Sequence, residues 1–179
     1  SSITNAPQLF THNASNIKNM NLKPLFYTLE EWSFQIQTFF QSFVLVFLVF
    51  LFFNNYLIVH LFLYSWLPLL NLIIFIYWFP LLICLISLRF TDIAQLVPIV
   101  LQLVFLTSPI LYKKESLGDL SWIVNLNFIY KILDPLRTSL IDGTIAYRDS
   151  FIILFVNLVS LFITLFILKL ESRRLPFWL

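Results

Sequence analysis

The chain has 179 residues, of which 60% are hydrophobic and 11% are charged, with a net charge of +2. Ordinary soluble domains carry roughly 45–50% apolar and about 25% charged residues, so this composition excludes a soluble domain. No Asp, Glu, Lys or Arg occurs between Glu31 and Arg89, whereas one membrane-spanning helix needs only ~20 apolar residues. We therefore predict an all-α integral membrane protein, with two spans in that interval.

The counts of rare residue types exclude several kinds of site. A single cysteine, Cys84, allows no internal disulfide and no cysteine-rich metal centre. The only glycines, Gly118 and Gly143, exclude a glycine-rich nucleotide loop. We expect no metal site, no cofactor bound by this chain and no nucleic-acid partner. Because the chain begins Ser-Ser without an initiator methionine, we also expect that part of a longer protein precedes it.

Residues 1–24 form a polar segment that is too hydrophilic to cross a bilayer. We predict a loop there, with a short helix from Ala6 to Ser15. Proline disfavours helix in the residue before it and is tolerated in a first turn, so Pro24 marks the start of the first span. Composition leaves two interpretations open, a solvated tail and a contact loop for a soluble partner.

Long apolar runs predict four spans, at residues 25–53, 66–88, 93–112 and 151–170. Asn54 to Tyr56 form the turn after the first span, and His60 is expected to cap a helix or to form a hydrogen bond. In the second span, Pro80 should kink the helix.

The first span carries a polar stripe at helical spacing, formed by Glu30, Ser33, Gln37 and Gln41. Polar groups at membrane depth are costly and usually face protein or water. The stripe therefore either bonds a neighbouring helix or lines a path for a substrate.

The segment 113–149 mixes charged and apolar residues. From Phe128 to Ile141, apolar residues recur near every fourth position, and Lys131, Asp134 and Arg137 lie on other faces. This pattern predicts an amphipathic helix, broken or bent at Pro135, that ends at the C-cap signal Asp142-Gly143. It should lie at the membrane interface or dip partly into the membrane.

With four spans, residues 1–23, the turn at Arg89 and the tail 171–179 lie on one side, and 113–149 lies on the other. The cations of the first side flank the spans directly, which favours the cytoplasm for that side. Residues 113–149 would then be outside the cell.

A series of short motifs carries a family resemblance. In chain order they are Ile17-Lys18 with Leu22-Lys23-Pro24, Arg89-Phe-Thr-Asp92, Leu101 to Tyr112 (LQLVFLTSPILY), Asn127, Leu136-Arg137, Gly143 and Arg173 to Leu179 (RRLPFWL). Together they resemble the permease subunit of type-2 ABC exporters, in the branch that carries O-antigen, capsule or teichoic acid. Phe128 stands where that branch usually has a proline, and Ser108 intervenes before Pro109.

The resemblance implies a six-span permease, of which this chain holds the last four spans, in the bacterial cytoplasmic (inner) membrane. It implies a homodimer with separate ABC ATPase subunits that bind ATP and magnesium, and a lipid-linked glycan as substrate. Residues 113–149 would be short re-entrant gate helices on the outer face. The ATPase contact would involve Ile17, Lys18, Lys23 and Pro24. The gate and structural motif would comprise Arg89, Asp92, Pro109, Tyr112, Asn127, Arg137 and Gly143.

A path for sugars suits aromatic side chains, because pyranose rings stack on them through their C–H faces. Phenylalanine is also an ordinary lipid-facing residue, so most of the 21 phenylalanines need no such role. The candidates for the path are Gln37, Gln41, Tyr77, Trp78 and Phe105.

Three other classes stay open. One is a type-2 ABC permease for a lipid or a drug. Another is a membrane-embedded enzyme of glycan or lipid assembly, which would need convergent acids or histidines. His12 and His60 fall on opposite sides and no acidic pair lies within a span, so we expect no catalytic residues. The third is a structural subunit of a larger membrane complex.

Overall fold

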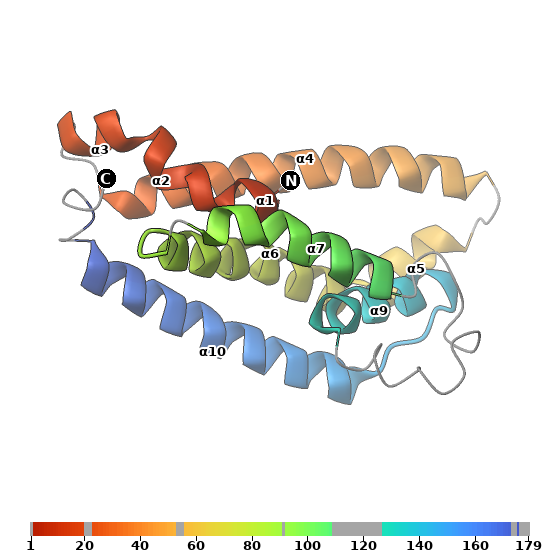
Figure 1. The fold of residues 1–179 in the computed structure, drawn as a ribbon. Helices are drawn as coiled ribbons and strands as arrows, with labels where there is room; N and C mark the ends of the chain where they lie inside the picture. The colour runs from red at the N-terminus through yellow and green to blue at the C-terminus, as the bar shows by residue number, and fades with distance from the viewer. Residues whose placement is uncertain are drawn as a thin grey trace.

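The computed structural model describes residues 2–19, 23–52, 56–90, 92–108, 127–172 and 175. Within these ranges all regular structure is helical, and long helices lie side by side along one direction (Figure 1). The predicted all-α membrane fold is confirmed.

Three helices in the described ranges are long and apolar enough to cross a membrane: α4 (Pro24–Leu51), α6 (Trp66–Ser87) and α10 (Tyr147–Glu171). Their 28, 22 and 25 residues correspond to lengths of ~33–42 Å, which exceed the ~30 Å of a hydrocarbon core. These helices coincide with the predicted spans 25–53, 66–88 and 151–170. Helix α6 runs through Pro80 without a break.

Helix α7 (Ile93–Thr107) covers the first part of the predicted span 93–112. Its 15 residues reach only ~22 Å, and Ser108 is extended, with φ −80° and ψ 132°. The structure therefore describes residues 93–108 of the predicted span 93–112. The helix ends where it does because a proline, here Pro109, drives the preceding residue out of the α region. Pro109 and Tyr112 themselves lie outside the described residues.

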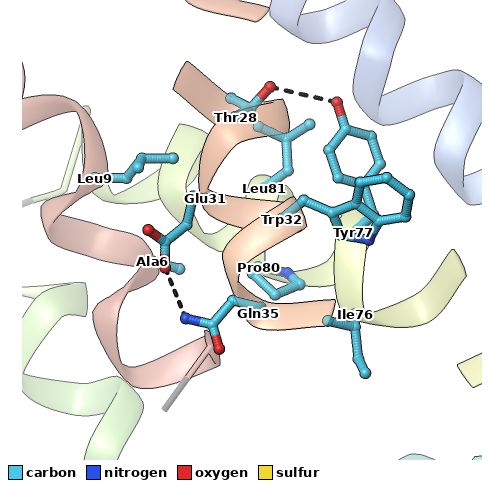
Figure 2. Close-up of a pocket in the computed structure, with 10 residues that line it drawn as sticks. All are labelled: Ala6, Leu9, Thr28, Glu31, Trp32, Gln35, Ile76, Tyr77, Pro80 and Leu81. Carbon is cyan, nitrogen blue, oxygen red and sulfur yellow. Dashed lines mark hydrogen bonds between the residues drawn. The ribbon is translucent and has the colours of Figure 1, made fainter. Parts of the chain in front are cut away.

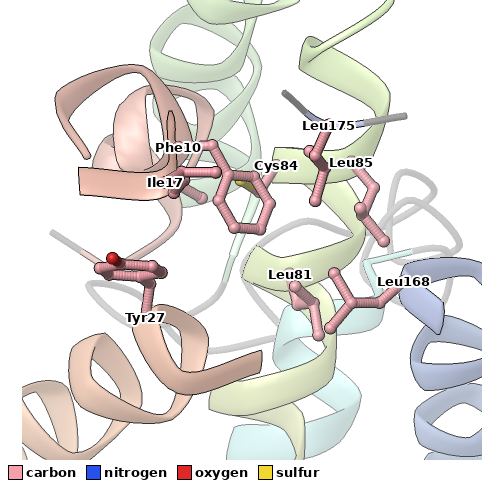
Figure 3. Packing of buried hydrophobic residues seen from close by; sticks show 9 residues of the cluster. Phe10, Ile17, Tyr27, Leu81, Cys84, Leu85, Leu168 and Leu175 are labelled. Carbon is pink, nitrogen blue, oxygen red and sulfur yellow. The ribbon is translucent and has the colours of Figure 1, made fainter. Parts of the chain in front are cut away.

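Residues 2–19 are helical beyond the predicted bounds Ala6 to Ser15, and several of their apolar side chains are buried, which argues against a solvated tail. They form α1 (Ser2–Asn5), the 3₁₀ turn η1 (Ala6–Gln8), α2 (Leu9–His12) and α3 (Ala14–Asn19). Phe10 is fully buried and Ala6 nearly so, in a cluster with Cys84 of α6 and Leu168 of α10 (Figure 3). The hydroxyl of Ser87 donates to the carbonyl of Pro7 at 3.3 Å. A few apolar residues thus anchor a segment whose overall composition is polar.

Two shorter helices lie at the other end of the molecule. Helix α9 (Phe128–Ile141) has the predicted bounds, but it continues through Pro135 where a break or bend was expected. Helix α5 (Leu57–Tyr64) was not predicted, because its eight residues, apolar except for His60, lead into the apolar run of α6 with no charged residue or glycine between them.

Helix α6 is the central helix, and it contacts α10, η1, α9 and α4. Its contact with α10 contains buried polar groups. Asn157, 2% exposed, accepts from Trp78 Nε1 at 3.0 Å and donates to the carbonyl of Asn71 at 3.2 Å. Asn71 in turn donates to the carbonyl of Ser150 at 3.0 Å. These bonds fix the register between the two helices.

We predict that Asn157→Ala destabilises the full-length protein by about 1–2 kcal/mol, because it leaves the half-buried indole N–H of Trp78 without its acceptor. Unfolding in mixed detergent micelles measures the change. Leu158→Ala, at an exposed position one residue along α10, is the control and should change stability less. Equal stabilities of Asn157→Ala and the parent protein would show that the amide contact does not hold α10 on α6.

Candidate functional site at the two ends of the bundle

The helices that carry or flank the described motif residues come together at two opposite ends of the molecule (Figure 1). What we call the Arg89 end contains α3, the start of α4, the end of α6 and the end of α10. The opposite end, which we call the α9 end, contains α5, α9 and the start of α10. The N-terminal segment, the turn at Arg89 and the end of α10 therefore lie together, as the predicted topology requires.

At the α9 end, Asn127 joins the end of α7 to the start of α9. Its Nδ2 donates to the carbonyl of Val104 at 3.0 Å and to the hydroxyl of Ser108 at 2.7 Å. Its Oδ1 accepts from the backbone N–H of Tyr130 at 3.1 Å, which caps α9. One side chain, 7% exposed, thus determines where α9 begins relative to α7.

The C-terminal end of α9 is bonded to α5 and to the start of α6. His60 Nδ1 lies 3.0 Å from the carbonyl oxygen of Leu140, so the predicted hydrogen-bonding role of His60 is confirmed. The hydroxyls of Ser65 and Ser139 lie 3.0 Å apart, and both residues are fully buried.

Gly143 ends α9 in a conformation that only glycine adopts easily, with φ +61°. A Cβ atom at this position would lie 2.5 Å from His60 Nε2, well inside van der Waals contact. Glycine is therefore needed at position 143 of the motif because the backbone passes close to the His60 ring.

Between these two attachments, α9 rests on α6 through an apolar face. Ile132 and Leu136 are buried against Leu72 and Phe75, and the ring of Phe128 lies 5.1 Å from that of Phe79. The predicted apolar face of α9 is confirmed. Its other side is polar, with exposed cations at Lys131 and Arg137.

At the Arg89 end, Arg89 Nη2 lies 2.6 Å from Glu171 Oε1 and forms a salt bridge between the ends of α6 and α10. The predicted motif partner Asp92 is exposed and precedes α7 without a side-chain cap. Sequence reasoning missed Glu171, because it lies 82 positions from Arg89.

The four residues predicted to contact an ATPase have different environments. Ile17 is 7% exposed and belongs to the buried cluster of Phe10 and Leu175 (Figure 3), so its side chain supports the fold and is not available to a partner. Lys18 and Lys23 are exposed, and Pro24 is half-buried as the first residue of α4. Only the two lysines present charge to the surroundings.

The five path candidates do not converge on one site. Gln37 and Gln41 are exposed on α4, and Phe105 is exposed on α7. Trp78 is engaged with Asn157, and the hydroxyl of Tyr77 lies 3.3 Å from that of Thr28 (Figure 2). The cavity beside Tyr77, also lined by Glu31 and Gln35, has a volume of about 30 Å³. That volume accommodates a water molecule but not a sugar ring.

The family model described as "ABC-2 type transporter" matches residues 22–141, from the start of α4 to the end of α9. The chain belongs to this family. No curated protein matches it. Membership makes the chain a multi-pass membrane subunit of an ABC transporter, which works with an ABC ATPase subunit.

In this ABC-2 family member we predict that Gly143→Ala displaces the end of α9, because the added Cβ meets His60 and because φ +61° costs ~1–2 kcal/mol outside glycine. In the double variant Gly143→Ala/His60→Ala, the clash with His60 is removed and only the cost of the positive φ should remain. The thermal midpoint of the full-length protein measures both effects. A midpoint for Gly143→Ala equal to that of the parent would contradict the close contact.

Proposed function

We propose that this chain forms the membrane path of an exporter for lipid-linked cell-surface polysaccharide in the bacterial cytoplasmic membrane. The exporter comprises two copies of the permease and two ATPase subunits. The Arg89 end faces the cytoplasm and the α9 end faces outward. The family supports the transporter class, and the motif series from Arg89 to Gly143 supports the polysaccharide branch.

The observation that carries the substrate class is the exposed polar face of α4. Glu30, Ser33, Gln37 and Gln41 are all exposed on this helix, although α4 is a membrane span. Lipid tails cannot satisfy carboxylate and amide groups, so this face requires protein or water beside it. Side-chain amides and a carboxylate in a row suit a hydroxyl-rich glycan better than an apolar drug.

Aromatic rings continue this helix toward the α9 end. Phe39, Phe43 and Phe47 stack in succession, with centroids 5.7 and 5.9 Å apart. Phe39 packs against the cluster that seats α9 on α6. At 3.6 residues per turn, these rings lie on the side of α4 opposite Gln37 and Gln41, so they support the seat of α9 and do not belong to the exposed polar face.

The gate we propose is α9. Its attachments are neutral hydrogen bonds at Asn127, His60 and Ser65 together with the apolar face on α6. Each neutral bond contributes about 0.5–1.5 kcal/mol. Breaking a few of them therefore costs no more than the ~5.5 kcal/mol that shifts a two-state protein from almost entirely closed to almost entirely open. A lid held this way can open and close again.

The test uses the full-length permease with its ATPase subunit in proteoliposomes. We predict that an undecaprenyl diphosphate-linked oligosaccharide stimulates ATP turnover and that Gln37→Leu/Gln41→Leu reduces this stimulation about tenfold. Thr38→Val, an exposed neighbour whose hydroxyl bonds its own helix, is the control. A separate measurement tests assembly. The amount of ATPase that co-purifies with the Lys18→Glu/Lys23→Glu permease shows whether the two exposed lysines contribute to the complex.

Stimulation by a phospholipid or an apolar drug, but not by the lipid-linked oligosaccharide, would replace the glycan with the second candidate, a lipid or drug permease. Equal stimulation of the glutamine variant and the parent would remove the polar face of α4 from the path.

A further inference from the structure

Helix α9 reaches from the α9 end of the molecule toward the middle of the bundle. Near its C-terminal end, the hydroxyl of Ser139 lies 3.0 Å from that of Ser65, the residue directly before α6. At its N-terminal end, the ring of Phe128 lies 5.1 Å from that of Phe79 and 6.2 Å from that of Phe75. Phe75 and Phe79 flank the middle of α6. The first turn of α9 is therefore level with the middle of a membrane span.

A lysine lies close to that depth. Lys131 follows Phe128 by three residues, or ~4.5 Å along the axis of α9. Because a hydrocarbon core is ~30 Å thick, the Cα atom of Lys131 lies ~10 Å below the outer surface of the core. Ile132 and Leu136 pack against α6, whereas Lys131 is exposed. The ammonium group thus lies outside the face by which α9 is seated.

The position of Lys131 differs from that of the other cations in the part of the chain that the structure describes. Those cations lie at the ends of the spans or nearer to them, and they are Lys18, Lys23, Arg89, Arg137, Arg148 and Lys169. Arg137 lies ~9 Å farther out along α9 and already has an interaction within the chain. Lys131 forms no salt bridge with another described residue. It is therefore the cation that a group crossing the membrane beside α9 would meet near the middle of the span.

The stability of α9 does not explain a lysine at this position. Lys131 lies near the N-terminal end of the helix, where the macrodipole disfavours positive charge, and the first turn has no acidic residue to offset it. Charged groups at membrane depth are costly, and they face protein, water or a substrate pathway. The exposed ammonium group of Lys131 therefore points to a space beside α9 that water or an anion fills.

We propose that Lys131 binds the phosphate of the exported lipid-linked glycan as that phosphate crosses the middle of the membrane. This inference rests on the proposed function and adds to it a residue that selects a phosphorylated carrier. An ammonium group is a compact charge that pairs well with phosphate. The exposed face of α4 offers amides to sugar hydroxyls, but α4 has no charged residue after Glu31. The phosphate therefore finds its counter-charge on α9, while the glycan meets the amides of α4.

The test uses the full-length permease with its ATPase subunit, purified in detergent. Native mass spectrometry measures the binding of undecaprenyl diphosphate, undecaprenol, phosphatidylglycerol and inorganic pyrophosphate. In the parent protein we expect undecaprenyl diphosphate to bind most tightly of the four, because only this probe has both a prenyl chain and the charge of a diphosphate.

Variants at one position separate the charge from the fold. Lys131→Gln should weaken the binding of undecaprenyl diphosphate about tenfold, a difference of ~1.4 kcal/mol, and should leave the binding of undecaprenol and the thermal midpoint unchanged. Lys131→Arg keeps the charge and should bind like the parent. Arg148→Gln removes an exposed cation at the start of α10, on the same side of the membrane. It is the matched control and should also bind like the parent.

Equal binding of undecaprenyl diphosphate by Lys131→Gln and by the parent would overturn the proposal. If the thermal midpoint of that variant also falls, Lys131 serves an ion pair within the chain, for which Glu115 and Asp119 lie outside the described residues. An equal loss of phosphatidylglycerol binding in Lys131→Gln would overturn the proposal as well, because the lysine would then serve a bilayer phospholipid. So would pyrophosphate that binds as tightly as undecaprenyl diphosphate, because the ligand would then be a free phosphate.

Failure of the proposed function is a separate result. It would appear as a parent permease whose ATP turnover does not respond to the lipid-linked oligosaccharide, whereas failure of this inference would leave that response intact and independent of Lys131.

Discussion

In a membrane, a buried amide or hydroxyl must find its hydrogen-bond partners within the protein, because lipid tails offer none. Helix α6 meets this constraint on several sides at once. Asn71 and Trp78 bond α10, Ser65 bonds α9, and Ser87 bonds the N-terminal segment. The apolar surface around these bonds is not distinctive in a chain that is 60% hydrophobic. The polar contacts therefore give the packing of α6 its specificity.

Helix α6 also links the two ends that we assign to function. One end carries the salt bridge from Arg89 to Glu171, and the other carries the attachment of α9 at Ser65. Between them lie 22 helical residues, or ~33 Å of continuous helix. In the mechanism we propose, a shift imposed at the Arg89 end is carried along α6 to the seat of α9, where weak neutral bonds release the gate.

The sequence predicted those features that depend on length and periodicity. Apolar runs located α4, α6 and α10, and the four-residue recurrence from Phe128 to Leu140 located α9 with the buried residues Ile132 and Leu136. The end of α7 also follows from the sequence, because Pro109 disfavours helix at Ser108.

Other features depend on contacts between residues that are distant in sequence, and no local sequence pattern predicts such contacts. Glu171 pairs with Arg89 across 82 positions, and Asn157 bonds Asn71 across 86. The packing of Phe10 and Ile17 against α6 was hidden by the polar residues around them. For the same reason Ile17 was assigned to a partner contact when it belongs to the core. Among the path candidates, Tyr77 and Trp78 were chosen for their chemistry, yet both form hydrogen bonds within the chain.

The central claim is that α9 must leave its seat on α6 for export to proceed. The most direct measurement introduces Ser65→Cys and Ser139→Cys, whose native hydroxyls lie 3.0 Å apart, into the full-length permease with Cys84→Ala. A disulfide between them joins the start of α6 to α9. The account predicts that oxidation stops glycan export in proteoliposomes, that reduction restores it, and that neither single-cysteine variant responds. Export at the parent rate by the fully cross-linked permease would contradict the account.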